Sequence, residues 1–210
     1  MNTFSDIEAE LFSRGMRMLA GVDEAGRGPL AGPVVAAAVI FAPGTRLDGI
    51  ADSKVLAHGR RTMLRDAILA QAIGTGIGIA DHGEIDELNI LQASILAMHR
   101  AIEALPIIPE FLLVDGNRFH HPSLPYRTVV RGDARCFSIA AASILAKEHR
   151  DSLMLLLDAQ YPSYGFAKHK GYPTPEHIAA LRAHGPSSVH RLSFRVRELE
   201  AQLARMPHGG

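Results

Sequence analysis

Four acidic residues stand where an apolar segment gives way to a turn. Asp23 and Glu24 close the apolar run that starts at Leu19. Asp115 closes a second apolar run, and Asp133 precedes an alanine-rich segment. Ligands of open α/β sheets collect beyond the carboxyl ends of strands, so these carboxylates can share one edge. Such oxygen ligands favour Mg²⁺ or Mn²⁺ over zinc. Taken alone, each acid is also explained as a turn residue or a helix N-cap.

A glycine-rich turn follows the first acidic pair. Adjacent carboxylates repel, and on a regular strand Asp23 and Glu24 would point to opposite faces. Gly26 and Gly28 allow the backbone to turn there. The amides of Gly26-Arg27-Gly28 are open to a ligand, and the fork of Arg27 suits a phosphate. The alternative is a tight turn with a solvated arginine.

Three further polar segments could meet a polyanion. The run from Lys168 to Tyr172 mixes cations with an aromatic ring, as surfaces that follow a nucleic-acid backbone do. The alternative is a solvated loop with Tyr172 packed on the core. Ser53-Lys54 reads as a loop. Lys147 and Arg150 share one face of a predicted helix, where Arg150 could be a plain surface charge.

Strand and helix patterns alternate along most of the chain and indicate an α/β fold with a C-terminal helical extension. We expect one domain over residues 17–205 and a helical lead-in over residues 1–16. The predicted strands are 19–25, 34–41, 74–80, 111–115 and 126–130, and the predicted helices are 5–19, 60–72, 84–105, 138–157, 175–184 and 194–206.

The overall charge hides a division along the chain. The 210 residues hold 22 basic and 22 acidic side chains, and such a zero net charge argues against a nucleic-acid binder. However, residues 1–129 carry 11 basic and 15 acidic side chains, whereas residues 130–197 carry 10 and 5. The single cysteine excludes a disulfide framework, and neither a signal peptide nor a membrane-spanning stretch is evident. We therefore expect a cytoplasmic protein.

Several segments, in order, resemble bacterial ribonuclease HII, the type 2 ribonuclease H. The resemblance covers roughly residues 19–197. The matching segments are Ala20-Gly-Val-Asp-Glu-Ala-Gly-Arg-Gly-Pro-Leu30, Asp52-Ser-Lys54, Glu84-Ile-Asp-Glu-Leu-Asn-Ile-Leu91, Val114-Asp-Gly-Asn117, Gly132-Asp-Ala134, Ser138-Ile-Ala-Ala-Ala-Ser-Ile-Leu-Ala-Lys147 and Tyr164-Gly-Phe-Ala-Lys-His-Lys-Gly-Tyr172.

The resemblance implies a ribonuclease H-like fold with a mixed five-stranded sheet. It implies an endonuclease that cleaves RNA in RNA–DNA hybrids and incises duplex DNA at embedded ribonucleotides by a two-metal-ion mechanism, leaving 3′-hydroxyl and 5′-phosphate ends. Asp23, Glu24, Asp115 and Asp133 fall on the family's catalytic metal positions.

The resemblance also implies a set of substrate-binding residues. Gly26-Arg27-Gly28 falls on the motif that recognises the ribose 2′-hydroxyl, and Tyr172 on the tyrosine that packs against the adjoining deoxyribose. The implied set comprises Gly26, Arg27, Gly28, Ser53, Lys54, Lys147, Lys168 and Tyr172. We expect a monomer, with Gln202-Leu203 as a candidate docking point for a replication or repair partner, although a plain helix end explains that dipeptide too.

The chain departs from the family's pattern at four positions, and none is an expected metal ligand. Val55 replaces a lysine and Leu192 an arginine, while Arg131 keeps the charge of a lysine. Glu148 places an acid near a surface expected to be basic. Two alternatives stay open: a metal-dependent phosphatase or nuclease of another specificity, and a non-catalytic RNA–DNA hybrid-binding protein.

Overall fold

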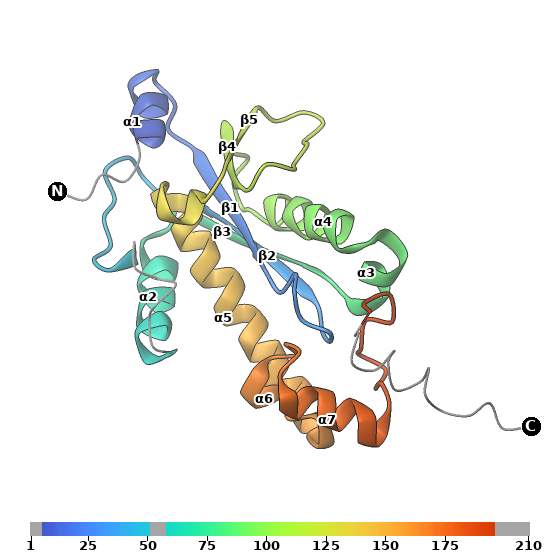
Figure 1. Ribbon diagram of the computed structural model, residues 1–210. Coiled ribbons are helices and arrows are strands. Elements are labelled where there is room, and N and C mark those ends of the chain that lie inside the picture. The colour runs from blue at the N-terminus through green and yellow to red at the C-terminus, as the bar shows by residue number, and fades with distance from the viewer. Residues whose placement is uncertain (1–5, 51–57, 196–210) are drawn as a thin grey trace, which may run out of the picture.

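A mixed five-stranded sheet forms the centre of the molecule (Figure 1). The computed structural model describes residues 6–50 and 58–195. The strands stand in the order β3-β2-β1-β4-β5. β1 pairs antiparallel with β2 and parallel with β4, so the sheet is mixed as expected. The strands are β1 (Leu19–Ala25), β2 (Val34–Ile40), β3 (Gly74–Ala80), β4 (Phe111–Asp115) and β5 (Tyr126–Val129).

Helices cover both faces of this sheet (Figure 1). The α-helices are α1 (Asp6–Ser13), α2 (His58–Gln71), α3 (His82–Leu88), α4 (Ile90–Glu103), α5 (Phe137–Gln160), α6 (Phe166–His169) and α7 (Pro175–His184), and two 3₁₀ turns are η2 (Gly132–Ala134) and η3 (Pro162–Tyr164). None of the helices in the described ranges is long and apolar enough to cross a membrane.

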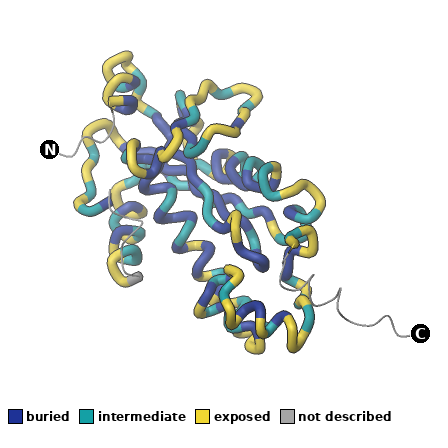
Figure 2. Tube along the Cα trace, in the orientation of Figure 1, coloured by how far each residue is buried: buried dark blue, intermediate teal, exposed yellow. Residues whose placement is uncertain are grey.

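Alternating side chains divide the core into two layers. Val22 and Ala36 face α4, whereas Ala37 and Val39 face α5 and α2. Figure 2 shows that the central strands and the inner faces of these helices are buried. In β3, an added Cβ at Gly78 would lie 2.0 Å from the carbonyl oxygen of Ala97, so glycine lets α4 pack directly on the strand.

Glu8 fastens α1 to the start of α5. Its carboxylate accepts hydrogen bonds from the amides of Phe137 and Ser138, at 2.8 and 3.0 Å, and from the Ser138 hydroxyl at 2.6 Å. Negative charge is favourable where the first amides of a helix lack helical partners. This contact fixes the beginning of α5, which runs across the sheet beside β1.

One long helix predicted over residues 84–105 is wrong, because two helices occupy this segment. Asn89 separates them with a φ of +71° and a ψ of 162°, a backbone conformation that residues other than glycine rarely adopt. Its side-chain oxygen accepts hydrogen bonds from the amides of Leu91 and Gln92 and so caps α4. The predicted helix over residues 5–19 ends early, at Ser13.

The last described segment packs beneath the turn that follows β1. Ala31 and His190 form an isolated antiparallel bridge. Residues 191–195 are not helical, so the helix predicted from Phe194 does not begin there, and its remainder lies outside the described residues. Asp86 of α3 holds this segment through hydrogen bonds from the amides of Leu192 and Ser193.

Candidate active site

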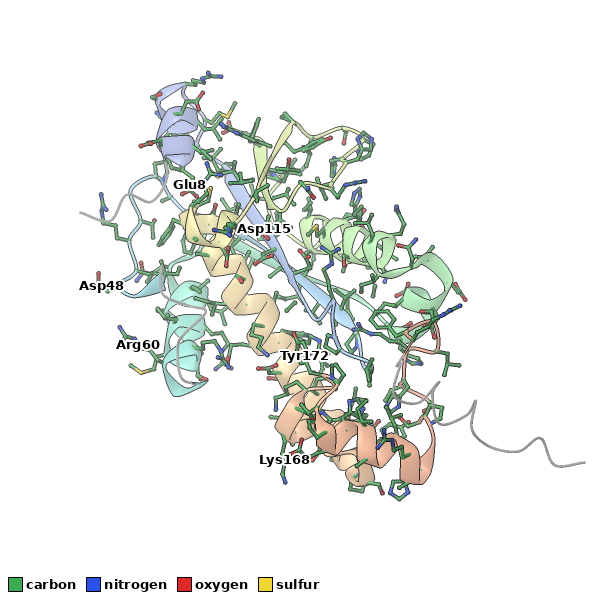
Figure 3. All side chains as sticks on the ribbon, in the orientation of Figure 1. Glu8, Asp48, Arg60, Asp115, Lys168 and Tyr172 are labelled. Atoms are coloured by element: carbon green, nitrogen blue, oxygen red, sulfur yellow. The ribbon has the colours of Figure 1, made fainter. Side chains whose placement is uncertain are left out.

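Parallel pairing of β1 with β4 brings two of the predicted carboxylates together. Val22 pairs with Val114, and Asp23 and Asp115 are the next residue on each strand. The Asp115 Oδ1 atom accepts a hydrogen bond of 2.5 Å from the Gly132 amide. This bond places η2, and with it the buried Asp133, beside the end of β4. Asp115 lies close to the start of α5 in Figure 3.

Asp23 is buried among other carboxylates. Burial raises the pKa of its carboxyl group well above the ordinary range, and the charges of Glu24 and Asp115 raise it further. Hydrogen bonds from the Ser143 side chain and the Glu24 amide act in the opposite direction. The net direction is upward, so the folded chain disfavours three negative charges at this place.

The two carboxylate oxygens of Glu24 differ in their hydrogen bonding. Its Oε1 atom lies 3.1 Å from Nη1 of Arg27. Its Oε2 atom is buried and has no hydrogen-bond partner. Burial raises the pKa of the Glu24 carboxyl group, while Arg27 lowers it and Asp115 raises it again. A buried oxygen without a partner is costly, so this atom is suited to receive a ligand.

These carboxylates suit a hard divalent cation. Cations of this kind take oxygen ligands, and a positive charge would offset both the burial and the carboxylate repulsion that raise the pKa of Asp23 and Glu24. Within residues 6–50 and 58–195, no three His, Cys, Asp or Glu side chains are arranged so that they could hold a metal ion as they stand. The fit to a cation therefore rests on the chemistry of the donors and on the unsatisfied Glu24 oxygen.

The glycine-rich turn and Tyr172 face each other, although the sequence separates them widely. Gly26 has a φ of +98°, and a Cβ there would meet the Nε atom of Arg150 at 2.0 Å. At Gly28, an added Cβ would lie 3.5 Å from Cε1 of Tyr172, which is ordinary contact. The Tyr172 side chain is 42% exposed, so it does not disappear into the core. The structure thus places one exposed ring beside the turn.

The predicted lysines differ in their surroundings. Lys147 Nζ lies 2.6 Å from Oδ1 of Asp151, so it already has an acidic partner. Lys168 is exposed on α6 and is labelled in Figure 3. Ser53 and Lys54, like the substituted Val55, lie outside the described residues.

Glu148 is not the surface acid that the sequence suggested. The side chain is buried between α5 and α2, where Oε1 accepts a hydrogen bond of 3.0 Å from Nε of Arg61 and Oε2 one of 3.2 Å from the Thr62 hydroxyl. Arg61 of α2 pairs with the buried Glu148 carboxylate, so Glu148 adds no exposed negative charge beside the site.

Arg150 and Arg191 were not predicted to shape the site. Both are buried, with 1% and 2% of their surface exposed, so the surface position considered for Arg150 is wrong. Both guanidinium groups donate to main-chain carbonyls of residues 26–33. Burial and the nearby Arg150 charge lower the pKa of Arg191 to about 9. No local signal marks either arginine in the sequence, because these carbonyls lie more than 100 residues away from both along the chain.

A cavity lies away from the carboxylates, beside α1. It has a volume of about 300 Å³ and is lined by residues from α1, the end of β2 and the start of α5, among them Phe12, Thr45 and Phe137. None of the predicted site residues lines it. The candidate site therefore rests on the carboxylates and not on this cavity.

Known proteins share the sequence pattern and the fold of this chain. The family model described as Ribonuclease HII matches residues 20–197. A ribonuclease HII of Pelodictyon phaeoclathratiforme is 54% identical and covers 87% of this chain and 91% of its own. One from Nitrosospira multiformis is 57% identical, covering 86% and 92%.

Two solved archaeal structures share the fold. The ribonuclease H2 from Pyrococcus horikoshii OT3 matches with a TM-score of 0.75 at 25% identity, covering 90% of this chain and 100% of that one. The ribonuclease HII in the complex with PCNA from Archaeoglobus fulgidus matches with a TM-score of 0.73 at 27% identity, covering 86% and 96%. The ribonuclease H-like architecture expected from the sequence is therefore confirmed.

Proposed function

The chain belongs to the ribonuclease HII family, and we propose that it is a divalent-metal-dependent endonuclease that hydrolyses the RNA strand of RNA–DNA hybrids. The proposal extends to incision of duplex DNA at single embedded ribonucleotides, with 3′-hydroxyl and 5′-phosphate ends. Asp23, Glu24, Asp115 and Asp133 are proposed as the catalytic, metal-holding residues.

The observation that carries the proposal is the buried carboxylate group beside an open turn. Burial raises the pKa of Asp23 and Glu24, and the charge of Asp115 raises both further. A fold that keeps these charges together loses stability unless a cation joins them. Such groups are typical of functional sites.

The chain's own residues have distinct parts in this reaction. Asp23 and Asp115, on neighbouring strands, would hold a cation against the sheet edge, and Glu24 would offer its unsatisfied Oε2 atom. The Gly132 amide keeps the Asp115 carboxylate in place. Divalent ions at this edge supply Lewis acidity and charge neutralisation for an in-line displacement at phosphorus. No side-chain nucleophile is required.

The turn at residues 26–28 is the proposed reader of RNA. The 2′-hydroxyl is the group that distinguishes ribose from deoxyribose. Gly28 leaves space between the backbone and Tyr172, and an exposed tyrosine can stack against a sugar or a base. Because this turn continues directly from β1, it is fixed relative to Asp23 and Glu24.

The spacing along α5 suits a substrate that crosses both parts. Asp23 is hydrogen-bonded by Ser143, and Arg150 lies 6.0 Å from the centre of the Tyr172 ring. Seven residues of α-helix correspond to about 10 Å, which is about three nucleotides along the axis of a duplex. Lys147 and Lys168 are proposed contacts to the backbone, and for Lys147 this requires exchange of its Asp151 partner.

Neither alternative from the sequence accounts for these residues as well. A protein that only binds hybrids has no use for several carboxylates near the substrate phosphates, because like charges weaken binding. A nuclease or phosphatase with no preference for RNA has no use for the Gly28–Tyr172 gap.

The proposal also covers the identity of the metal ions and of a protein partner. Carboxylate ligands accept Mg²⁺ and Mn²⁺ alike, and we propose that two such ions act in the reacting complex. The PCNA complex of the Archaeoglobus fulgidus relative supports a replication partner for this chain. The candidate docking dipeptide, Gln202-Leu203, lies outside the described residues.

The test is cleavage of a hybrid with a labelled RNA strand. The protein is incubated with Mg²⁺, with Mn²⁺ and with a chelator. We expect internal cleavage with either ion and none with the chelator. Cleavage that survives chelation would reject the metal-dependent mechanism, and intact RNA under every condition would reject the activity.

A further inference from the structure

The buried Arg191 side chain donates hydrogen bonds to main-chain carbonyl oxygens in residues 26–33. Its guanidinium group donates to the carbonyls of Gly26 at 2.7 Å, Arg27 at 3.0 Å, Gly32 at 2.9 Å and Pro33 at 3.1 Å. Only a planar, forked cation can serve so many acceptors at once. The buried arginine thus ties the turn, through two of its carbonyls, to the carbonyls of residues 32 and 33.

This arrangement determines where the amides of the turn point. The peptide bonds are trans, and a planar trans peptide directs its N–H opposite to its C=O. Because the carbonyls of Gly26 and Arg27 point inward to Arg191, the amides of Arg27 and Gly28 point away from it. Both residues are exposed, so these donors are directed to the surface where a substrate would lie.

His190, the residue before Arg191, is connected to Tyr172, which together with the turn forms the proposed ribose reader. The Nε2 atoms of His190 and His177 are 3.0 Å apart, and Nδ1 of His177 lies 2.9 Å from the Tyr172 carbonyl oxygen. Since a carbonyl only accepts, Nδ1 of His177 carries the hydrogen, and its Nε2 accepts from His190. On the far side, Nδ1 of His190 accepts from the Ser187 amide at 2.9 Å. With both rings neutral, every ring nitrogen of His177 and His190 is therefore assigned as a hydrogen-bond donor or acceptor.

We propose that His190 and Arg191 are positioning residues that hold the Gly26-Arg27-Gly28 turn and Tyr172 in one fixed relation. This inference rests on the proposed function, and it deepens it by assigning ribonucleotide discrimination to a buried layer that touches no substrate. Adjacent residues on one strand-like segment reach both halves of the reader, so displacement of the segment changes the gap between Gly28 and the ring.

Two substrates separate positioning from general stability. One is a DNA duplex with a single ribonucleotide, and the other is an RNA–DNA hybrid of the same length and sequence. The single ribonucleotide offers one register for the reader. The hybrid offers a ribose at every position, so a misplaced reader still finds a hydroxyl. The quantity to compare is the ratio of kcat/KM on the two substrates.

The first variant is Arg191→Lys, which keeps the charge but loses the fork. We expect it to lose about tenfold more activity on the single-ribonucleotide duplex than on the hybrid, because a small misplacement of reacting groups is enough for such a loss. The matched control is Ile178→Val, a buried change in the same C-terminal core at a residue that belongs neither to the Gly26-Arg27-Gly28 turn nor to the Tyr172 ring. It should leave the ratio unchanged, and urea unfolding measures the stability of both variants.

A second pair keeps the test decisive if Arg191→Lys does not fold. His190→Gln preserves a donor at the position of Nε2, whereas His190→Leu removes it. We expect the glutamine variant to retain the wild-type ratio and the leucine variant to lose single-ribonucleotide cleavage selectively. Equal losses on both substrates would overturn the inference while leaving the activity in place. A wild-type protein that cleaves neither substrate would overturn the proposed function and the inference with it.

Discussion

Arg27 Nη1 lies 3.1 Å from Glu24 Oε1, so the arginine of the glycine-rich turn is paired with a carboxylate of the proposed metal site. The Arg27 side chain is half exposed, whereas the Glu24 side chain is nearly buried. The pair links the surface that would read the ribose to the group that would hold the metal. A cation that binds Glu24 must do so beside a positive guanidinium group.

The first prediction is that Arg27→Ala tightens metal binding in the absence of substrate. Loss of the positive charge removes a competitor for Glu24. Because half of the Arg27 side chain is exposed, we take the range of solvent-screened pairs, about 0.2–1 kcal/mol, or up to about fivefold in affinity. Calorimetric titration with Mn²⁺ measures the change. Arg14→Ala, which breaks an exposed pair with Glu10 on α1, is the control. Weaker Mn²⁺ binding by the Arg27 variant would show that Arg27 does not compete with the cation for Glu24.

The second prediction concerns Asp115→Asn. The amide keeps an oxygen for the Gly132 amide but loses the negative charge, so we expect a normal fold and a loss of cleavage on the order of 10³-fold. Binding of hybrid in a chelator should stay equal or improve, because repulsion of phosphate decreases. Cleavage rates and fluorescence anisotropy measure the two effects. A variant that cleaves normally with Mg²⁺ would show that Asp115 is not a metal ligand.

The third prediction compares two glycines of the same turn. Gly26→Ala places a Cβ against the buried Arg150 at a positive φ, so it should destabilise the fold by about 1–3 kcal/mol. Gly28→Ala meets only ordinary contact with Tyr172 and should fold like the wild type. Its methyl group narrows the gap, however, and should raise KM for the single-ribonucleotide duplex. Urea unfolding and steady-state kinetics distinguish them, and an active, stable Gly26→Ala variant would disprove the packing described for the turn.

The fourth prediction is a pH dependence of stability from His190. Burial and the neighbouring His177 lower its pKa from 6.5 to about 4 in the folded chain. Between pH 6.5 and 4 the unfolded chain therefore binds a proton that the folded chain refuses, and the free energy of unfolding falls as pH falls, by roughly 1–3 kcal/mol.

The difference between wild type and His190→Gln isolates this effect from the carboxylates. Asp23 acts in the opposite direction, because its raised pKa makes the folded chain bind a proton more readily as pH falls. Urea unfolding of both proteins between pH 7.5 and 4.5 gives the difference curve. A curve that does not vary with pH would show that His190 is not held neutral.

The sequence predicts the strands well, because their patterns are local. The runs at Gly74–Ala80 and Phe111–Asp115 are bounded by turn residues, and both predicted ranges agree with the structure. The division at Asn89 was missed because the apolar spacing continues through it. Only a backbone angle and two capping hydrogen bonds mark the break, and a left-handed asparagine leaves no mark in hydrophobic periodicity.

The carboxylates could be found from the sequence, but the layer beneath the turn could not. Asp115 ends a strand and precedes a glycine, which is a local signal. Arg150 and Arg191 have charges that ordinarily indicate a surface, and their burial depends on carbonyls that are distant in the chain. His177 and His190 likewise acquire defined hydrogen bonds only when α7 packs against the last described segment.

The most direct test uses a DNA duplex with one ribonucleotide and the same duplex made entirely of DNA. Cleavage with Mg²⁺ is followed by mapping the product ends on a denaturing gel. The proposed site predicts one incision at the ribonucleotide, with 3′-hydroxyl and 5′-phosphate ends, that disappears with a chelator or with Asp115→Asn. The all-DNA duplex should stay intact. Equal cleavage of both duplexes, or an incision that persists without divalent ions, would contradict a carboxylate metal site coupled to a ribose reader.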